Sequence, residues 1–171
     1  MLINLLAAIL MFGATGNLPG DSLSNFQKKL SRDIILNMGL PPDSHRGDTC
    51  YHYTELIKVE INKYYKVVSI ELSDSAPQWI KEDIDRQKKQ KDINYKALDS
   101  LAMKGGLRNC SLVFPFIIES DDFPCGQEMK KPRLPAEYFQ FGGKKLKGNI
   151  FFGEEIKYRV PIRHIVKTII P

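Results

Sequence analysis

The sequence predicts an α+β domain in which helices pack on one face of a small antiparallel or mixed sheet. The expected order is an α-β-β-α-β core followed by further strands near the C-terminus. Apolar residues recur at the helical spacing of three and four near the start of the chain, and at the strand period of two in its middle. The chain has 171 residues, 43% apolar and 26% charged, which is typical of one globular domain.

Residues 1–16 are predicted to form a signal peptide. They carry no charge and end in the small residues Ala14, Thr15 and Gly16. Their apolar run is too short to cross about 30 Å of hydrocarbon as a helix, and a buried N-terminal helix is the alternative. We therefore expect a periplasmic or otherwise exported protein with no stable membrane span in the mature chain, a core over 17–120, and a strand-rich extension of the same domain over 121–171.

The first helix is predicted from Asp21 to Gly39. One helical face carries its apolar residues, which are Leu23, Phe26, Leu30, Ile34 and Met38. Ser24 and Gln27 have the spacing of a capping box, in which each side chain bonds a free backbone N–H group. Gly39 and the prolines at 41 and 42 end the helix.

The period then changes to two, which predicts an antiparallel hairpin. Ile57, Val59 and Ile61 share one face of a first strand, and 67–72 alternate in the same way after a turn at 62–64. Pro77 suits the first turn of a second helix, whose basic end at 86–91 is either a solvated helix end or a loop.

Another helical stretch, from 95 to 102, stops at Gly105 and Gly106. The segment 111–118 follows and is the most apolar part of the mature chain, so a strand covered on both faces is predicted there. Strand-like pieces at 138–141, 149–152 and 156–169 either extend the sheet or pack across it, and the sequence leaves both arrangements open.

This order of elements after an export signal resembles the C-terminal domain of TonB-type energy transducers. Residues 26–41 resemble the first helix of that family, 56–73 its hairpin and 112–118 its last strand. The hairpin turn lacks the usual Asp-Gly, the next connection is long, and neither a membrane anchor nor a proline-rich linker is present. The resemblance therefore implies at most a detached relative of the transducer domain.

On this pattern, strand-order rules place the third strand beside the first and antiparallel to it. The third strand then ends where the first begins, which brings Cys125 near Cys50 and leaves Cys110 at the opposite end. We predict a disulfide between Cys50 and Cys125, because exported proteins favour such bridges. The chain-entropy model rates so long a loop at roughly 4 kcal/mol.

In TonB-like domains an exposed edge strand pairs with an extended segment of an outer-membrane receptor, and the resemblance points to the third strand here. The expected partner-binding residues are Ser111, Leu112, Val113, Phe114, Phe116 and Ile118. The alternative is a core strand whose edge is covered by the C-terminal strands. Pro115 also lacks an N–H group, as prolines on protected edges do.

The remaining patterns indicate no catalytic, cofactor or metal site. His52 follows Cys50 by two residues, but zinc sites repeat such pairs. Basic clusters at 86–91, 130–133 and 144–147 lack interleaved aromatic residues, so a solvated positive surface is expected and no nucleic acid. The sequence thus predicts a non-enzymatic module that binds an envelope protein or extended peptide, with two alternatives: an exported hydrolase or thiol enzyme using Cys110 with a histidine, and a structural envelope protein.

Overall fold

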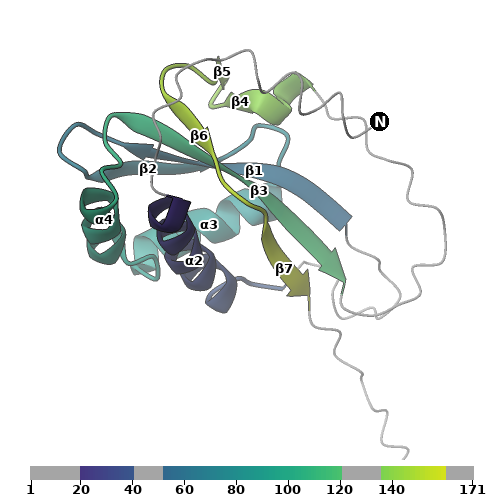
Figure 1. The fold of residues 1–171 in the computed structure, drawn as a ribbon. Coiled ribbons are helices and arrows are strands. Elements are labelled where there is room, and N and C mark those ends of the chain that lie inside the picture. The colour runs from purple at the N-terminus through teal and green to yellow at the C-terminus, as the bar shows by residue number, and fades with distance from the viewer. Residues whose placement is uncertain (1–19, 41–51, 121–135, 161–171) are drawn as a thin grey trace, which may run out of the picture.

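The computed structural model describes residues 20–40, 52–120 and 136–160 (Figure 1). The predicted signal peptide and the predicted disulfide partners Cys50 and Cys125 lie outside these residues. The helices and strands are α2 (Gly20–Leu36), β1 (His52–Ile61), β2 (Val67–Leu72), α3 (Gln78–Gln90), α4 (Tyr95–Lys104), β3 (Cys110–Ser120), the 3-10 helix η2 (Ala136–Phe139), β4 (Gln140–Phe141), β5 (Lys144–Lys145), β6 (Ile150–Phe152) and β7 (Ile156–Val160).

The main sheet has five strands, in the order β2-β1-β3-β6, with β7 also paired to β3. β1 is antiparallel to both β2 and β3, whereas β6 and β7 run parallel to β3. His52 lies opposite Glu119, so β3 ends where β1 begins. The predicted placement of β3 beside β1 is therefore confirmed.

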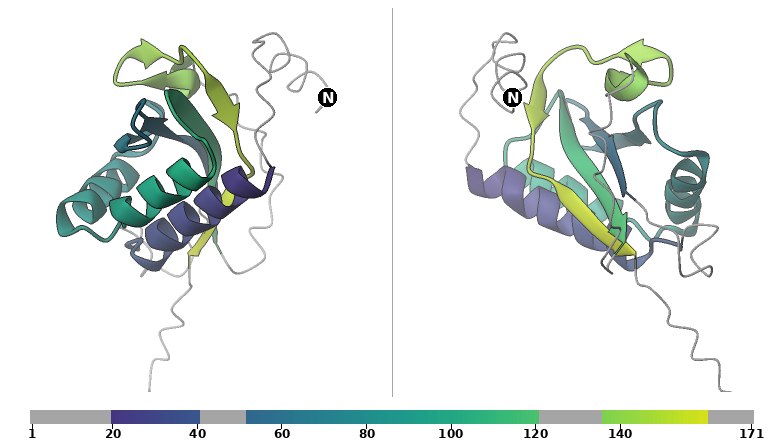
Figure 2. Two further views of the ribbon diagram at one scale, coloured as in Figure 1. Left: turned by 60° about the vertical axis from the view of Figure 1, so that its left-hand side comes forward. Right: turned by 90° about the vertical axis from the view of Figure 1, so that its right-hand side faces the viewer.

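The helices α2, α3 and α4 lie together on one face of this sheet (Figure 2). Phe26, Leu30 and Ile34 of α2 are fully buried, as are Phe114 and Phe116 of β3. Burying a side chain of this size stabilises a fold by about 1.5–3 kcal/mol. The predicted α+β class, with helices on one face of a mixed sheet, is confirmed.

The start of α2 differs from the prediction. The helix begins at Gly20, so Ser24 lies inside it and cannot act as an N-cap. Gln27 instead bonds a segment that is distant in the sequence. Its Oε1 accepts the Glu154 N–H at 3.0 Å, and its Nε2 donates to the Glu155 carbonyl at 3.3 Å. A polar side chain in the helix thus holds the chain between β6 and β7.

The crossing from β6 to β7 also requires a glycine. A Cβ on Gly153 would lie 2.3 Å from a ring carbon of Phe114, a distance that real side chains do not tolerate. The Gly153 N–H donates to the Val113 carbonyl at 2.9 Å. The segment can therefore pass close over the middle of β3 and pair with both of its halves.

The basic run at 86–91 proves to be the end of α3 rather than a loop. The helix ends at Gln90, and Lys91 takes the left-handed conformation at φ 62°. Asn94 then caps α4 by accepting the Ala97 N–H, while the buried Asp33 of α2 accepts the Asn94 N–H. These contacts fix α4 against α2.

A smaller apolar cluster covers part of the opposite face of the sheet. Leu56 and Val113 point away from the helices and pack under Tyr138 and Phe141, which belong to η2 and β4. Beyond this cluster, the outer face carries Lys58, Glu60 and Ser111 together with the exposed Val68. No helix among the described residues has the length and apolar character that crossing a membrane would require.

Candidate functional site

The predicted partner-binding strand, β3, has neighbouring strands on both sides. β1 pairs with β3 from Cys110 to Glu119. On the other side, β6 pairs over Ser111–Val113 and β7 over Phe116–Ser120. The structure therefore corrects the expectation of an exposed edge, because strand addition needs unpaired N–H and C=O groups. The alternative of a core strand covered by C-terminal strands is the arrangement observed.

The six side chains expected to contact a partner divide into three groups. Four are fully buried toward the helices, namely Leu112, Phe114, Phe116 and Ile118. Val113 is fully buried on the other face, beneath Tyr138 and Phe141. Ser111 alone lines an open hollow of the surface.

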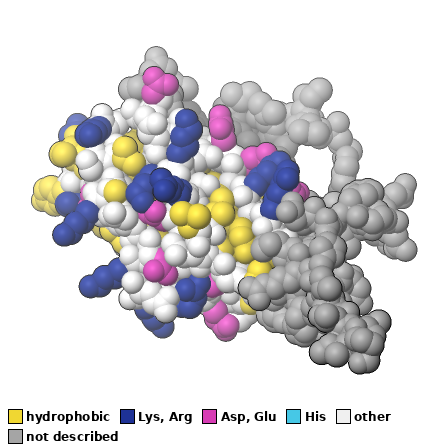
Figure 3. Space-filling model, turned by 90° about the horizontal axis from the view of Figure 1, so that it is seen from below, with side chains coloured by type: hydrophobic (Ala, Val, Ile, Leu, Met, Phe, Trp, Pro, Cys, Tyr) yellow, Lys and Arg dark blue, Asp and Glu magenta, His cyan; other side chains and the backbone are white. Residues whose placement is uncertain are grey.

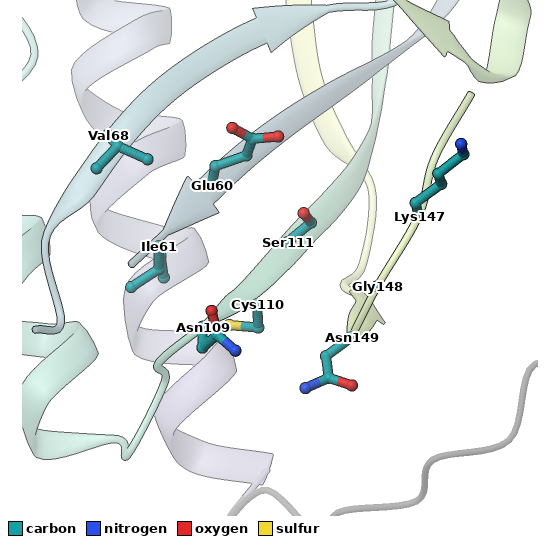
Figure 4. Close-up of a pocket in the computed structure, with 9 residues that line it drawn as sticks. All are labelled: Glu60, Ile61, Val68, Asn109, Cys110, Ser111, Lys147, Gly148 and Asn149. Atoms are coloured by element: carbon teal, nitrogen blue, oxygen red, sulfur yellow. The ribbon is translucent and has the colours of Figure 1, made fainter. Parts of the chain in front are cut away.

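Two adjoining hollows of about 460 Å³ each lie on the outer face of the sheet, and we call them together the trough. They share Glu60, Ser111 and Lys147. Figure 4 shows the first hollow: Val68 of β2 lies on one side, Lys147 and Gly148 on the other, and Ser111 between them. The trough therefore crosses the sheet from β2 to the chain that precedes β6.

Charged side chains form the floor of the trough. Lys58 donates to Glu60 and bridges to Glu71 at 2.9 and 2.8 Å, while Ser69 donates to Glu60 at 3.1 Å. Burial disfavours the charge on Lys58, but its bonds to the two carboxylates outweigh this and raise its pKa. The hydrogen bond from Lys58 lowers the pKa of Glu60, so both groups are ionised at neutral pH.

The wall of the trough is residues 140–149, which we call the arm. β4 and β5 pair antiparallel across a two-residue turn in which Gly142 and Gly143 have φ of 57° and 72°. Two positive φ values are typical of a type I′ hairpin turn, which glycine adopts without strain. The next residues, 144–149, continue along the trough toward β6.

Asp74, just after β2, holds this turn in place. Its two carboxylate oxygens accept the N–H groups of Gly142 and Gly143, each at 2.8 Å. Its own N–H donates to the Gln140 carbonyl at 2.8 Å. One side chain therefore fastens the arm to the end of the sheet.

Aromatic contacts seat the arm on the sheet face. The Lys58 ammonium lies 5.0 Å from the centroid of the Phe141 ring, a favourable cation–π distance. Tyr138 is buried, and desolvation, with a smaller contribution from Glu55, raises its pKa to about 12. The arm is thus held at its turn by Asp74 and at its start by Phe141, which packs with the buried Tyr138.

Cys110 lies at the end of the trough but is part of the core. It is 7% exposed, and burial raises the pKa of its thiol to about 11. A thiol with this pKa is protonated at neutral pH, whereas nucleophilic cysteines have lowered values. His52 is placed at the other end of β1, roughly 30 Å away along the strand.

The other histidines, His45 and His164, lie outside the described residues. Within the described ranges, no group of three or more His, Cys, Asp or Glu side chains could hold a metal ion.

The free edge of the sheet at β2 is partly blocked. Among the described strands β2 pairs with β1 alone. Asp99 of α4 accepts the Val67 N–H at 2.8 Å, and Lys88 of α3 donates to the Ile70 carbonyl at 3.2 Å. Side chains that occupy edge groups discourage the pairing of another strand. The trough is therefore the more accessible surface for a partner.

Part of this site carried a signal in the sequence. A Gly-Gly pair between Phe141 and Lys144 is a recognised mark of a two-residue hairpin and could have located the arm. Nothing in the sequence marked Asp74 as its anchor, because the residues that it binds lie 68 and 69 positions further along.

The fold and the trough together define an α+β domain with an open polar groove on the sheet face that the helices leave uncovered. No family model, curated protein or solved structure matches the chain.

Proposed function

We propose that this chain is an exported protein-binding module of a bacterial envelope, and that it holds an extended segment of a partner protein in the trough. The observation that carries the proposal is the shape of the site. Two hollows open to solvent join into one groove across three strands, with polar groups on its floor and one wall. An enclosed apolar cavity would suit a small molecule, whereas a long open groove suits a polypeptide.

The relationship to TonB-type transducer domains remains part of this proposal. It rests on the order helix, hairpin, helix, strand that the sequence pattern indicates. Export and a bridge between Cys50 and Cys125 belong to the same proposal. Binding would take place at the trough rather than at the edge of β3.

The thiol-enzyme alternative is less well supported. Its nucleophile would be Cys110, whose thiol is buried and whose pKa is raised rather than lowered. A structural envelope protein without a dissociable partner is the other alternative, and the same experiment separates it from a binding module.

The experiment places a photoreactive amino acid at Val68, which lines the trough and is 57% exposed. A matched probe replaces Met103, which is 61% exposed on α4 in the helix layer. Each protein is irradiated in envelope extract, and the crosslinked partner segment is identified, synthesised and titrated against the purified chain. We expect a segment crosslinked from the Val68 site alone that binds when isolated. Equal crosslinking from both sites, or none, would refute the proposal.

A further inference from the structure

The arm brings three lysines to one side of the trough. Lys144, Lys145 and Lys147 are exposed, and none forms an ion pair with a described carboxylate. All three line the same hollow as Lys58 and Glu60, so this row borders the trough floor. Unpaired cations held along a groove favour an anionic ligand.

The charge of the trough as a whole has the same sign. Its lining residues include four lysines and one glutamate, which gives a net charge of +3. The single acid, Glu60, is already bonded to Lys58 and Ser69. Glu71, one position further toward the β2 edge, is likewise paired with Lys58. The floor carboxylates are therefore engaged, whereas the lysines of the wall are not.

The trough also offers some apolar surface between these charges. Val68, which is 57% exposed, lines one end, and the half-buried Leu146 lines the other. An extended chain places successive side chains on opposite sides. A segment that alternates acidic and small residues could direct its carboxylates to the lysines of the wall and its small side chains toward Val68 and Leu146.

We infer that the trough selects an extended acidic polypeptide segment, whose carboxylates bind Lys144, Lys145 and Lys147. This inference rests on the proposed function and specifies the chemistry of the partner. An anionic lipid surface is a less suitable ligand, because the lysines border a groove with a floor of β-strands instead of a flat face. The helix side, in contrast, carries Lys and Arg side chains interspersed with apolar and acidic ones (Figure 3).

The test is fluorescence anisotropy with labelled twelve-residue peptides that alternate glutamate and threonine, glutamine and threonine, or lysine and threonine. The trough variant reverses three charges, K144E/K145E/K147E. The matched control, K28E/K89E/K96E, makes the same change in net charge at exposed lysines of α2, α3 and α4. A milder variant with glutamine at the three arm positions guards against misfolding, and circular dichroism checks each fold.

We expect the glutamate peptide to bind best. Because exposed ion pairs each contribute modestly, the trough variant should weaken its binding about tenfold, while the control variant should change it less than about threefold. The glutamine variant should fall between them. Equal weakening by both triple variants would show general charge attraction and overturn the inference.

Other outcomes would also overturn it. Equal affinity for the glutamine peptide would leave the trough as a binding groove without acid selectivity. Binding of the wild-type chain to phosphatidylglycerol vesicles through the arm lysines, without peptide binding, would assign the lysines to a lipid surface. No peptide binding, together with a productive Val68 crosslink, would refute the acidic ligand alone. If no peptide binds and the Val68 probe gives no crosslink, the proposed function is refuted as well.

Discussion

The Asp74 carboxylate is the feature of the trough whose removal has the most direct consequence. It accepts two N–H groups of the arm turn, from Gly142 and Gly143, each at 2.8 Å. Hydrogen bonds to a charged acceptor contribute about 1.5–3 kcal/mol each, and exposure to water reduces this toward about 1 kcal/mol. Asp74→Ala should therefore ease opening of the turn by about 2 kcal/mol, or roughly 30-fold. Asp74→Asn keeps one acceptor oxygen and should have about half that free-energy effect.

The assay is amide hydrogen exchange measured residue by residue. Local opening exposes the two glycine N–H groups, so their exchange should accelerate by these factors while amides of the core change little. Asp85→Ala is the matched control, because Asp85 is an exposed acid of α3 whose partner is Lys88. Unchanged exchange at Gly142 and Gly143 in Asp74→Ala would refute the claim that this side chain fastens the arm.

Three other predictions concern the core and the cysteines. Gly153→Ala should destabilise the fold by about 1–3 kcal/mol in a denaturant titration, because its Cβ would enter space that the Phe114 ring occupies. An unchanged stability would contradict this packing. Burial raises the pKa of Cys110 from 9.0 to about 11, so the buried thiol stabilises the fold fully below pH 9, and this contribution is lost as the pH rises through 11. Cys110→Ala should reduce the loss of stability at alkaline pH. The same pH profile in the variant and the wild type would refute this prediction. Non-reducing peptide mapping should recover Cys50 linked to Cys125, and a bridge that contains Cys110 would contradict the layout.

The elements that the sequence predicted correctly are those with a strict alternation between core and solvent. In β1, Ile57, Val59 and Ile61 face the helices, while Lys58 and Glu60 face the trough. A shift of one residue would bury the charges of Lys58 and Glu60, so the pattern allows only one pairing register. The first helix was predictable from its apolar stripe, of which Phe26, Leu30 and Ile34 are fully buried, although it ends at Leu36 and leaves Met38 outside it.

The C-terminal strands could not be placed in this way. β6 has three residues and β7 has five, and both pair with β3 only because the chain between them crosses Phe114 at Gly153. Gln27 holds that crossing from 127 and 128 residues away. Contacts of such separation leave no local periodicity, so the covered edge of β3 could not be distinguished from a free one.

The trough was not predictable for a related reason. The cluster at 144–147 was expected to form a solvated positive surface. Its three lysines are exposed in the structure, and Leu146 between them is half-buried. Their position beside Glu60 and Ser111 depends on Asp74 and the paired glycines of the turn. The trough forms where the arm is fastened to the sheet, and composition does not indicate that position.

A partner that binds in the trough, rather than at the edge of β3 or on the helix layer, should perturb only the backbone around the trough. An amide NMR titration of the full chain with the peptide of alternating glutamate and threonine measures this. We expect chemical-shift changes at Glu60, Val68 and Ser111 and along 143–149, with amides of α2 and α3 unchanged. Shifts confined to the helices, or spread evenly over the domain, would show that the trough is not where the peptide binds.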